Sequence, residues 1–169
     1  MKKRTTMLAL LLATGAGTCL QAQEKLTQFK VRDAITVRTP IMNDSINPKG
    51  EKYADKDLLK TPVVLDLADA PFQVLSTDTA GVLSFPKAEK DHSIYLLETS
   101  LRAERFMTGK LKVTSPARWE IFINGESKMS KENAEDSISG ASTREVNLRL
   151  EPEADYEITI KLLSGSKDK

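Results

Sequence analysis

The run Arg118-Trp119-Glu120-Ile121-Phe122-Ile123, followed at once by Asn124-Gly125, decides the fold class of this chain. Successive side chains of a strand point to opposite faces, so the tryptophan and the two isoleucines share one face. The Asn-Gly dipeptide accepts positive φ at both central positions of a tight hairpin turn. The return arm, residues 126–131, buries at most Met129, so we expect an edge strand whose lysines discourage edge-to-edge pairing.

The same kind of pattern extends outward from this hairpin. Short apolar or alternating segments are separated by turn signals, which is typical of an antiparallel sandwich. Residues 93–101 carry four consecutive apolar side chains, which favours a central strand covered on both faces. The sequence therefore predicts an all-β fold, a jelly-roll-like antiparallel β-sandwich of about seven to nine strands, comparable with sandwiches of this size. The other expected strands are 63–67, 81–85, 110–114, 146–150 and 156–162.

The domain organisation follows from where this alternation begins and ends. Before residue 62 the chain is polar and irregular, with proline and glycine punctuating it. Within this leader we expect a first strand over 33–38 and a turn of helix over 55–60. The predicted parts are a signal peptide (1–22), an extended polar leader (23–61), the β-sandwich domain (62–164) and a linker or tail (165–169).

The N-terminus has the three parts of a secretory signal. A positive cluster at 2–4 is followed by an apolar run at 7–13 and small residues before a cleavage point that we place after Ala22. The apolar run is about half the ~20 residues that a membrane span needs, so we expect no transmembrane segment. Cys19 raises the alternative of a lipoprotein, although Ala16 and Thr18 only partly fit that pattern. The sequence thus predicts export to the periplasm or the cell surface.

Composition limits what the mature chain could bind. Removal of residues 1–22 leaves 147 residues with 22 basic and 24 acidic side chains. A nucleic-acid partner usually requires a basic excess on one face, which this balance does not favour. The only cysteine leaves with the signal, so stability has to come from a packed core and not from disulfides.

A search for catalytic chemistry gives little. His92 is the only histidine, and no Gly-x-Ser-x-Gly motif or glycine-rich phosphate loop is present. One histidine and no mature cysteine serve zinc poorly. The acidic stretches 66–69 and 132–136 raise the question of calcium, but neither has the ligand spacing of a dedicated loop. We therefore assign no catalytic, cofactor or metal residues within these positions.

Carbohydrate binding is common among β-sandwiches and uses exposed aromatic rings. Trp119 is the sole tryptophan, and its strand phase predicts burial in the core over sugar stacking. We expect its partners to be Leu111, Val113, Leu148 and Ile158. Phe122 falls on the opposite face, which indicates either a seat for another domain or a two-sided sheet.

Two stretches carry a family resemblance. The run 106–116, continued by 120–125, is similar to galactose-binding-like jelly-roll modules, in which a strand ending near Ser-Pro leads into an Asn-Gly hairpin. The segments 42–47, 54–59 and 160–164 resemble the N-terminal region of exported prolyl-oligopeptidase-like proteins of Gram-negative bacteria. This resemblance implies a front module followed by a β-propeller and an α/β-hydrolase domain that carries the serine nucleophile, none of whose catalytic residues lies in this chain.

Three further positions resemble O-glycosylation sites of exported proteins in one group of such bacteria. Each has an aspartate, then a serine or threonine, then a small or aliphatic residue, and each falls in a predicted loop. Ordinary Asp-Ser turn chemistry explains the same pattern. The acceptor residues would be Ser45, Thr79 and Ser137.

Two functions from different classes follow. The first is a non-catalytic accessory or docking module of an exported hydrolase, of the prolyl-oligopeptidase type, whose partners are the other domains of the same polypeptide. The second is a free-standing periplasmic or surface protein that binds glycans. Whether the whole protein is an enzyme stays open at this point.

Overall fold

The computed structural model describes residues 5–14, 23–24, 26–36, 49–51, 55–60, 63, 71–86 and 93–164. It contains one short α-helix, and its strand pairs are antiparallel. The elements are β1 Thr5–Thr14, β2 Gln23–Glu24, β3 Gln28–Arg32, β4 Ile35–Thr36, α1 Asp55–Leu59, β5 Phe72–Ser76, β6 Val82–Pro86, β7 Ser93–Arg102, β8 Met107–Thr114, β9 Arg118–Ile123, β10 Glu126–Lys131, the 3₁₀ turn η1 Ile138–Gly140, β11 Thr143–Leu150 and β12 Asp155–Ser164.

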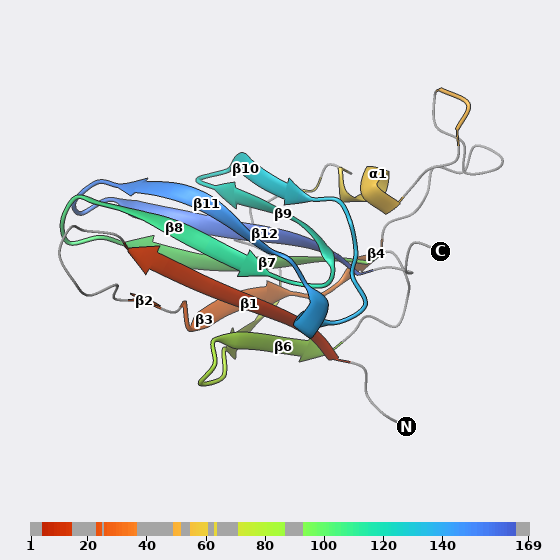
Figure 1. The fold of residues 1–169 in the computed structure, drawn as a ribbon, viewed down its shortest axis with the longest axis horizontal. Helices are drawn as coiled ribbons and strands as arrows, with labels where there is room; N and C mark the ends of the chain where they lie inside the picture. The colour runs from red at the N-terminus through yellow and green to blue at the C-terminus, as the bar shows by residue number, and fades with distance from the viewer. Residues whose placement is uncertain are drawn as a thin grey trace.

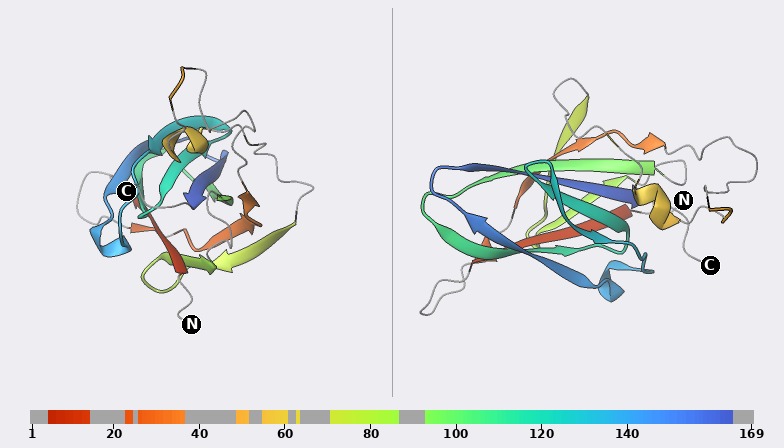
Figure 2. Two further views of the ribbon diagram at one scale, coloured as in Figure 1. Left: turned by 90° about the vertical axis from the view of Figure 1, so that its right-hand side faces the viewer. Right: turned by 90° about the horizontal axis from the view of Figure 1, so that it is seen from above.

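These strands form two facing sheets (Figure 1). Sheet A has the order β11-β8-β1-β2, with β6 paired to β1 as well. Sheet B has the order β10-β9-β12-β7-β3-β5, with β4 paired to the beginning of β7. Seen end-on, the two sheets curve around a common interior (Figure 2). The prediction of an all-β, sandwich-like fold is confirmed.

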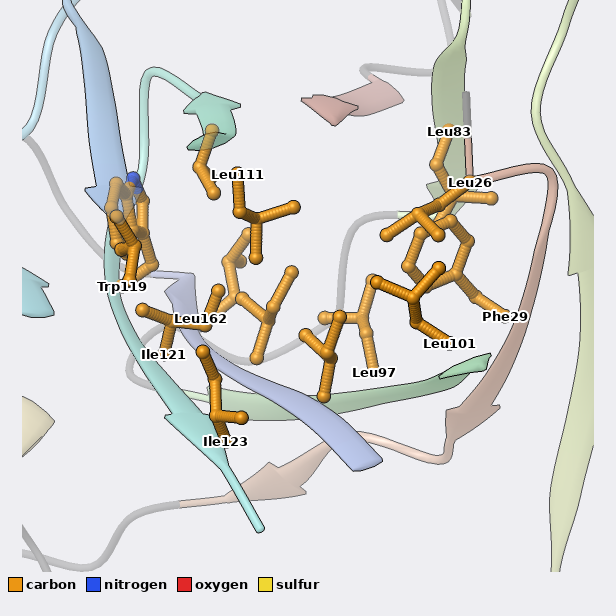
Figure 3. Close-up of a cluster of buried hydrophobic side chains, with 14 of the residues drawn as sticks. Leu26, Phe29, Leu83, Leu97, Leu101, Leu111, Trp119, Ile121, Ile123 and Leu162 are labelled. Atoms are coloured by element: carbon orange, nitrogen blue, oxygen red, sulfur yellow. The ribbon is translucent and has the colours of Figure 1, made fainter. Parts of the chain in front are cut away.

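The interior between the sheets is the main hydrophobic core. Apolar residues from alternate strand positions fill it, as expected for strands with one face inward. Figure 3 shows Trp119 at one end of this core and Phe29 at the other. Trp119 is fully buried, and the four predicted partners, Leu111, Val113, Leu148 and Ile158, belong to the same cluster. The predicted burial of Trp119 is confirmed.

Sheet B also carries a smaller core on its outer face. Leu58 and Leu59 of α1 form a cluster with Ile94, Leu96 and Leu163 of the sheet. The consecutive apolar residues of β7 are thereby divided between the two faces, with Tyr95 and Leu97 in the main core. The predicted two-sided central strand is confirmed, and the leader supplies the helix that covers its outer side.

The hairpin prediction is confirmed in its turn and corrected in its return arm. Asn124 and Gly125 have φ of 51° and 76°, and β10 lies at the edge of sheet B. The expectation that Met129 is the most buried residue of β10 is wrong. Met129 is partly buried, whereas Lys131 is fully buried, because its ammonium group finds acceptors inside the protein.

The strands before residue 80 match the prediction less well than the later ones. The predicted strand 33–38 is confirmed in part by the two-residue strand β4 at 35–36, while residues 37–38 lie outside the described ones. The longer leader strand, β3 at 28–32, was not predicted, and its Phe29 and Val31 reach the core. Strand β3 lies between β7 and β5, so this stretch of the predicted leader is part of sheet B. Strand β5 was not expected at all. The predicted strand 63–67 lies outside the described residues except for Val63, which packs against the smaller core on the outer face of sheet B.

Residues 5–14, inside the predicted signal peptide, form strand β1 in the middle of sheet A. The structure describes the unprocessed chain, so cleavage after Ala22 stays a prediction. No helix within the described ranges is long and apolar enough to cross a membrane.

Candidate functional site

A groove opens where β3 and β7 separate. The two strands pair only at Lys30 with Glu98 and at Val31 with Leu97, and beyond this point they fork apart. The fork encloses a cavity of about 470 Å³. Core residues line its inner part, with Phe29 and Leu101 side by side at that end of the interior (Figure 3). The polar residues along the groove are Thr27, Gln28, Lys30, Glu98, Thr99, Ser100 and Arg102.

An exposed apolar edge lies beside this groove. Phe72 and Val74 alternate along β5, the last strand of sheet B, and are 44% and 59% exposed. Val74 also lines the groove, and the Nζ of Lys30 stands 5.3 Å from the centre of the Phe72 ring. We refer to Phe72 and Val74 together as the β5 edge. Large apolar residues exposed in a row on an edge strand are a feature of interaction surfaces.

The charges around the groove are of both signs. Arg102 donates to Glu153 at 2.6 Å and lies 3.5 Å from Asp155, and all three side chains are more than half exposed. Ion pairs of this exposure contribute little to stability. Among the described lining residues, charged, hydrogen-bonding and apolar side chains are present, and no histidine or cysteine is among them.

The buried lysine Lys131 is structural. Its Nζ donates to the carbonyl oxygens of Ser115 and Ala117 and forms a 2.6 Å ion pair with Glu135. The other carboxylate oxygen of Glu135 accepts from the backbone N–H and the hydroxyl of Ser142. We call these groups the Lys131 cluster, and it ties the loop after β10 to the turn before β9.

This cluster also fixes the ionisation of Glu135. Burial raises the pKa of its carboxyl, but the hydrogen bonds from Lys131 and Ser142 together lower that pKa by more, so it lies below the ordinary value of 4.5. A second buried lysine, Lys161, lies on the outer face of sheet B opposite Glu120, at 4.0 Å. Burial lowers the pKa of Lys161, and the charge of Glu120 opposes this shift.

The acidic stretch 132–136 is not arranged as a calcium loop. The carboxylate of Glu135 is engaged by Lys131 and Ser142, and that of Glu132 lies 3.1 Å from Lys60. In the part of the chain that the structure describes, no three acidic, histidine or cysteine side chains come together as a metal site. The other stretch considered for calcium, 66–69, lies outside the described residues, as do His92 and Cys19.

Two of the three glycosylation candidates lie on exposed turns. Thr79 sits between β5 and β6, where the carboxylate of Asp78 accepts from the backbone N–H groups of Ala80 and Val82. That arrangement is the ordinary turn chemistry of aspartate. Ser137 is exposed, and its hydroxyl shares a 3.0 Å hydrogen bond with that of Ser139. Ser45 lies outside the described residues, and modification of all three stays a prediction.

The groove and the β5 edge were missed by sequence reasoning. The alternation of Phe72 and Val74 around a glutamine is a local strand signal that could have been found. The groove has no such signal, because it depends on two strands about 70 residues apart in the chain that separate at a particular register. A scan against protein-family models and a search of curated proteins found no match to this chain, so its geometry is the ground on which a function is proposed.

Proposed function

We propose that this chain is a non-catalytic accessory module of an exported protein and that it docks onto a neighbouring domain through the β5 edge. The observation that carries the proposal is the exposure of Phe72 and Val74 in a row on the last strand of sheet B. Exposed apolar residues on an edge strand are a liability for an isolated protein, and a permanent neighbour removes that liability.

The groove beside the β5 edge supports the same function. Lys30, Glu98 and Arg102 place charges of both signs at the border of the apolar row. Interfaces between domains combine an apolar centre with a polar rim in this way. A surface built like this suits an adjoining protein domain better than a small charged ligand, which would favour one sign of charge.

The neighbouring domains are proposed from the resemblance of the sequence. A β-propeller and an α/β-hydrolase domain of the prolyl-oligopeptidase type would follow this module, and the catalytic serine would belong to the latter. Two antiparallel sheets and the Asn124-Gly125 hairpin are compatible with a galactose-binding-like jelly roll. Export through a signal peptide cleaved after Ala22, to the periplasm or the surface, is part of the same proposal.

Glycan binding is the second candidate function. Trp119 does not serve it, because the indole ring is fully buried. Phe72 is the better platform, since its ring is partly exposed beside a groove that carries polar hydrogen-bonding groups. A titration of Phe72→Ala with oligosaccharides would support this candidate if the wild type binds and the variant does not.

The docking proposal is tested with a matched pair of phenylalanines. Phe72 and Phe106 are 44% and 49% exposed, and each has a cation about 5 Å from its ring, but only Phe72 adjoins the groove. The module and the remainder of its reading frame are produced as separate chains, and their association is measured by calorimetry. Phe72→Ser should weaken association at least tenfold, as loss of a buried aromatic anchor does, whereas Phe106→Ser should leave it unchanged.

Two observations would contradict the proposal. A stop codon directly after Lys169 would mean that no neighbouring domain follows in the same polypeptide. Equal effects of Phe72→Ser and Phe106→Ser on association would mean that the β5 edge is not the docking surface. Export and cleavage are tested separately by N-terminal sequencing of the secreted protein, which we expect to begin at Gln23. Retention of Met1, or a mass increase from acyl chains on Cys19, would contradict the predicted processing.

A further inference from the structure

Strand β1 joins the two parts of sheet A. Its second half, Ala9–Thr14, pairs with β8, and its first half, Thr5–Ala9, pairs with β6. Among the described strands, β6 and β8 do not pair with each other. In Figure 1, β1 crosses the front of the molecule between them. Strand β6 therefore belongs to sheet A only through β1.

The sequence of β1 does not fit a permanent strand at this place. Residues 7–13 are apolar without interruption, whereas β8 alternates Lys110, Leu111, Lys112 and Val113. A strand with one face in the core and one in water normally alternates in this second way. An uninterrupted apolar run is instead what a secretory signal requires. The segment has the composition of an export signal and occupies a strand position in the unprocessed chain.

We propose that cleavage after Ala22 vacates this position, and that the mature module accepts there an extended strand from a partner polypeptide. The inference rests on the export that is part of the proposed function. Loss of β1 removes the pairing partner of β6 opposite residues 5–9 and of β8 opposite residues 9–14, which is the situation that strand addition resolves. The position lies between two strands, so an added strand pairs along both of its edges.

The register of β1 indicates which side chains an incoming strand needs on its inner face. The partners of Leu8, Leu10 and Leu12 across the sheet are Leu83, Val113 and Leu111, which are fully buried core residues. An incoming strand in the same register therefore has to carry apolar residues at these three alternate positions. A polar strand would leave this part of the core without neighbours.

The charges on β8 indicate what the outer positions need. Lys110 and Lys112 both bind the single carboxylate of Glu145, at 2.8 and 3.2 Å, which leaves one positive charge in excess. Their partners across the sheet are positions 13 and 11 of β1, which hold Ala13 and Leu11. Opposite charges at directly opposed positions stabilise a strand pair. The partner strand is therefore amphipathic and acidic, and it runs antiparallel to β8 and β6.

The test uses the processed protein and a synthetic strand. Full-length chain is exported in a Gram-negative host, and the purified product is sequenced from its N-terminus. The probe is a peptide of residues 5–14 with Met7→Thr, Ala9→Thr, Leu11→Cys and Ala13→Glu. Because Cys19 leaves with the signal, a Lys112→Cys substitution supplies the only thiol of the mature protein. Directly opposed residues have Cβ atoms about 4.5–5.5 Å apart, close enough for a disulfide to form with a small adjustment.

The peptide cysteine is first activated as a mixed disulfide with thionitrobenzoate, so that the protein thiolate displaces thionitrobenzoate as it forms the new disulfide. We expect this exchange to be about tenfold faster with Lys112→Cys than with Lys128→Cys on the β10 edge, because binding raises the effective thiol concentration. A second peptide, with the cysteine at position 13 and glutamate at position 11, should prefer Lys110→Cys in the same way. If moving the cysteine from position 11 to position 13 moves the faster reaction from Lys112→Cys to Lys110→Cys, the peptide is bound in the register of β1 and not by non-specific association. If the processed protein is unfolded alone, adding either peptide should restore its β-sheet circular dichroism.

Equal rates at Lys112→Cys and Lys128→Cys would overturn the inference, and so would a processed protein that ignores both peptides, whether folded or unfolded. A product that begins at Met1 would overturn export and, with it, the vacated strand position. A product that begins at Gln23 without peptide capture would overturn the strand position alone. The two failures are therefore distinguished within one preparation.

Discussion

Replacing Lys131 with alanine should destabilise the protein far more than replacing Lys128 on the same strand. Both lysines make an ion pair with an N–O distance of 2.6 Å, Lys131 with Glu135 and Lys128 with Glu126. The pairs differ in burial, since the side chain of Lys131 is 2% exposed and that of Lys128 is 35% exposed. Comparing the two substitutions therefore measures the combined effect of burial and of the hydrogen bonds that Lys131 makes to backbone carbonyl oxygens.

The magnitude follows from the groups that Lys131 leaves behind. Removing one partner of a buried ion pair costs about 3–5 kcal/mol, because the remaining charge stays unpaired. The freed Glu135 is 26% exposed and regains some water, whereas the carbonyl oxygens of Ser115 and Ala117 lose their donor. We expect a loss of about 3 kcal/mol, at the lower end of that range. For Lys128→Ala the loss should be under about 0.5 kcal/mol, as for exposed pairs generally.

Urea unfolding followed by the fluorescence of the single tryptophan measures both values. A double-mutant cycle with Glu135→Gln then gives the coupling between the two charged groups, for which we expect about 1–3 kcal/mol. The reasoning would be refuted if Lys131→Ala and Lys128→Ala changed the free energy of unfolding by the same amount. It would also be refuted by a coupling near zero, which would mean that Lys131 is held by the carbonyl oxygens alone.

Three other perturbations have definite expected outcomes. Trp119→Ala should lower the free energy of unfolding by about 3–5 kcal/mol, because it empties a large volume of the core. Trp119→Phe should lower the free energy of unfolding much less, because the buried indole Nε1 finds no acceptor among the described residues and its removal breaks no hydrogen bond. Equal decreases for the two variants in calorimetric unfolding would contradict this. Gly125→Val places a β-branched residue at a φ of 76° and should cost about 1–3 kcal/mol, against a few tenths for Glu126→Ala in the same denaturation assay. Because the pKa of Glu135 is lower in the folded state than its ordinary 4.5, its stabilising contribution is present above that value and is lost as the pH falls through the folded pKa. Urea midpoints measured from neutral to acidic pH should therefore fall less steeply in Glu135→Gln than in the wild type, and parallel curves would count against this.

Much of sheet B could be predicted because its strands follow simple rules. The alternation around Trp119 and the Asn124-Gly125 turn are local signals, and each led to the correct element. The strand at residues 28–32 has the same alternation, with Phe29 and Val31 inward, but lies within a polar leader whose composition concealed it. At this strand the local composition outweighed the periodicity, although the periodicity was the better guide.

The buried lysine and the groove could not be predicted for a different reason. Lys131 is buried because carbonyl oxygens of Ser115 and Ala117, about fifteen residues earlier, point at it. The groove exists because β3 leaves β7 after two paired residues. Both features depend on contacts between segments that are distant in the sequence, and the residue pattern within one strand carries no information about such contacts.

The position of β12 sets the order in which the molecule can be assembled. This strand is the last of the described strands, yet it lies in the middle of sheet B, between β9 and β7. Its pairing with β7 joins Ser164 to Ser93 and Asp155 to Arg102. During synthesis from the N-terminus, sheet B is therefore two separate pieces until the final strand has left the ribosome. Closing loops of this length is slow compared with forming a hairpin. The module can therefore complete sheet B only after β12 has been synthesised, whatever local hairpins form before it.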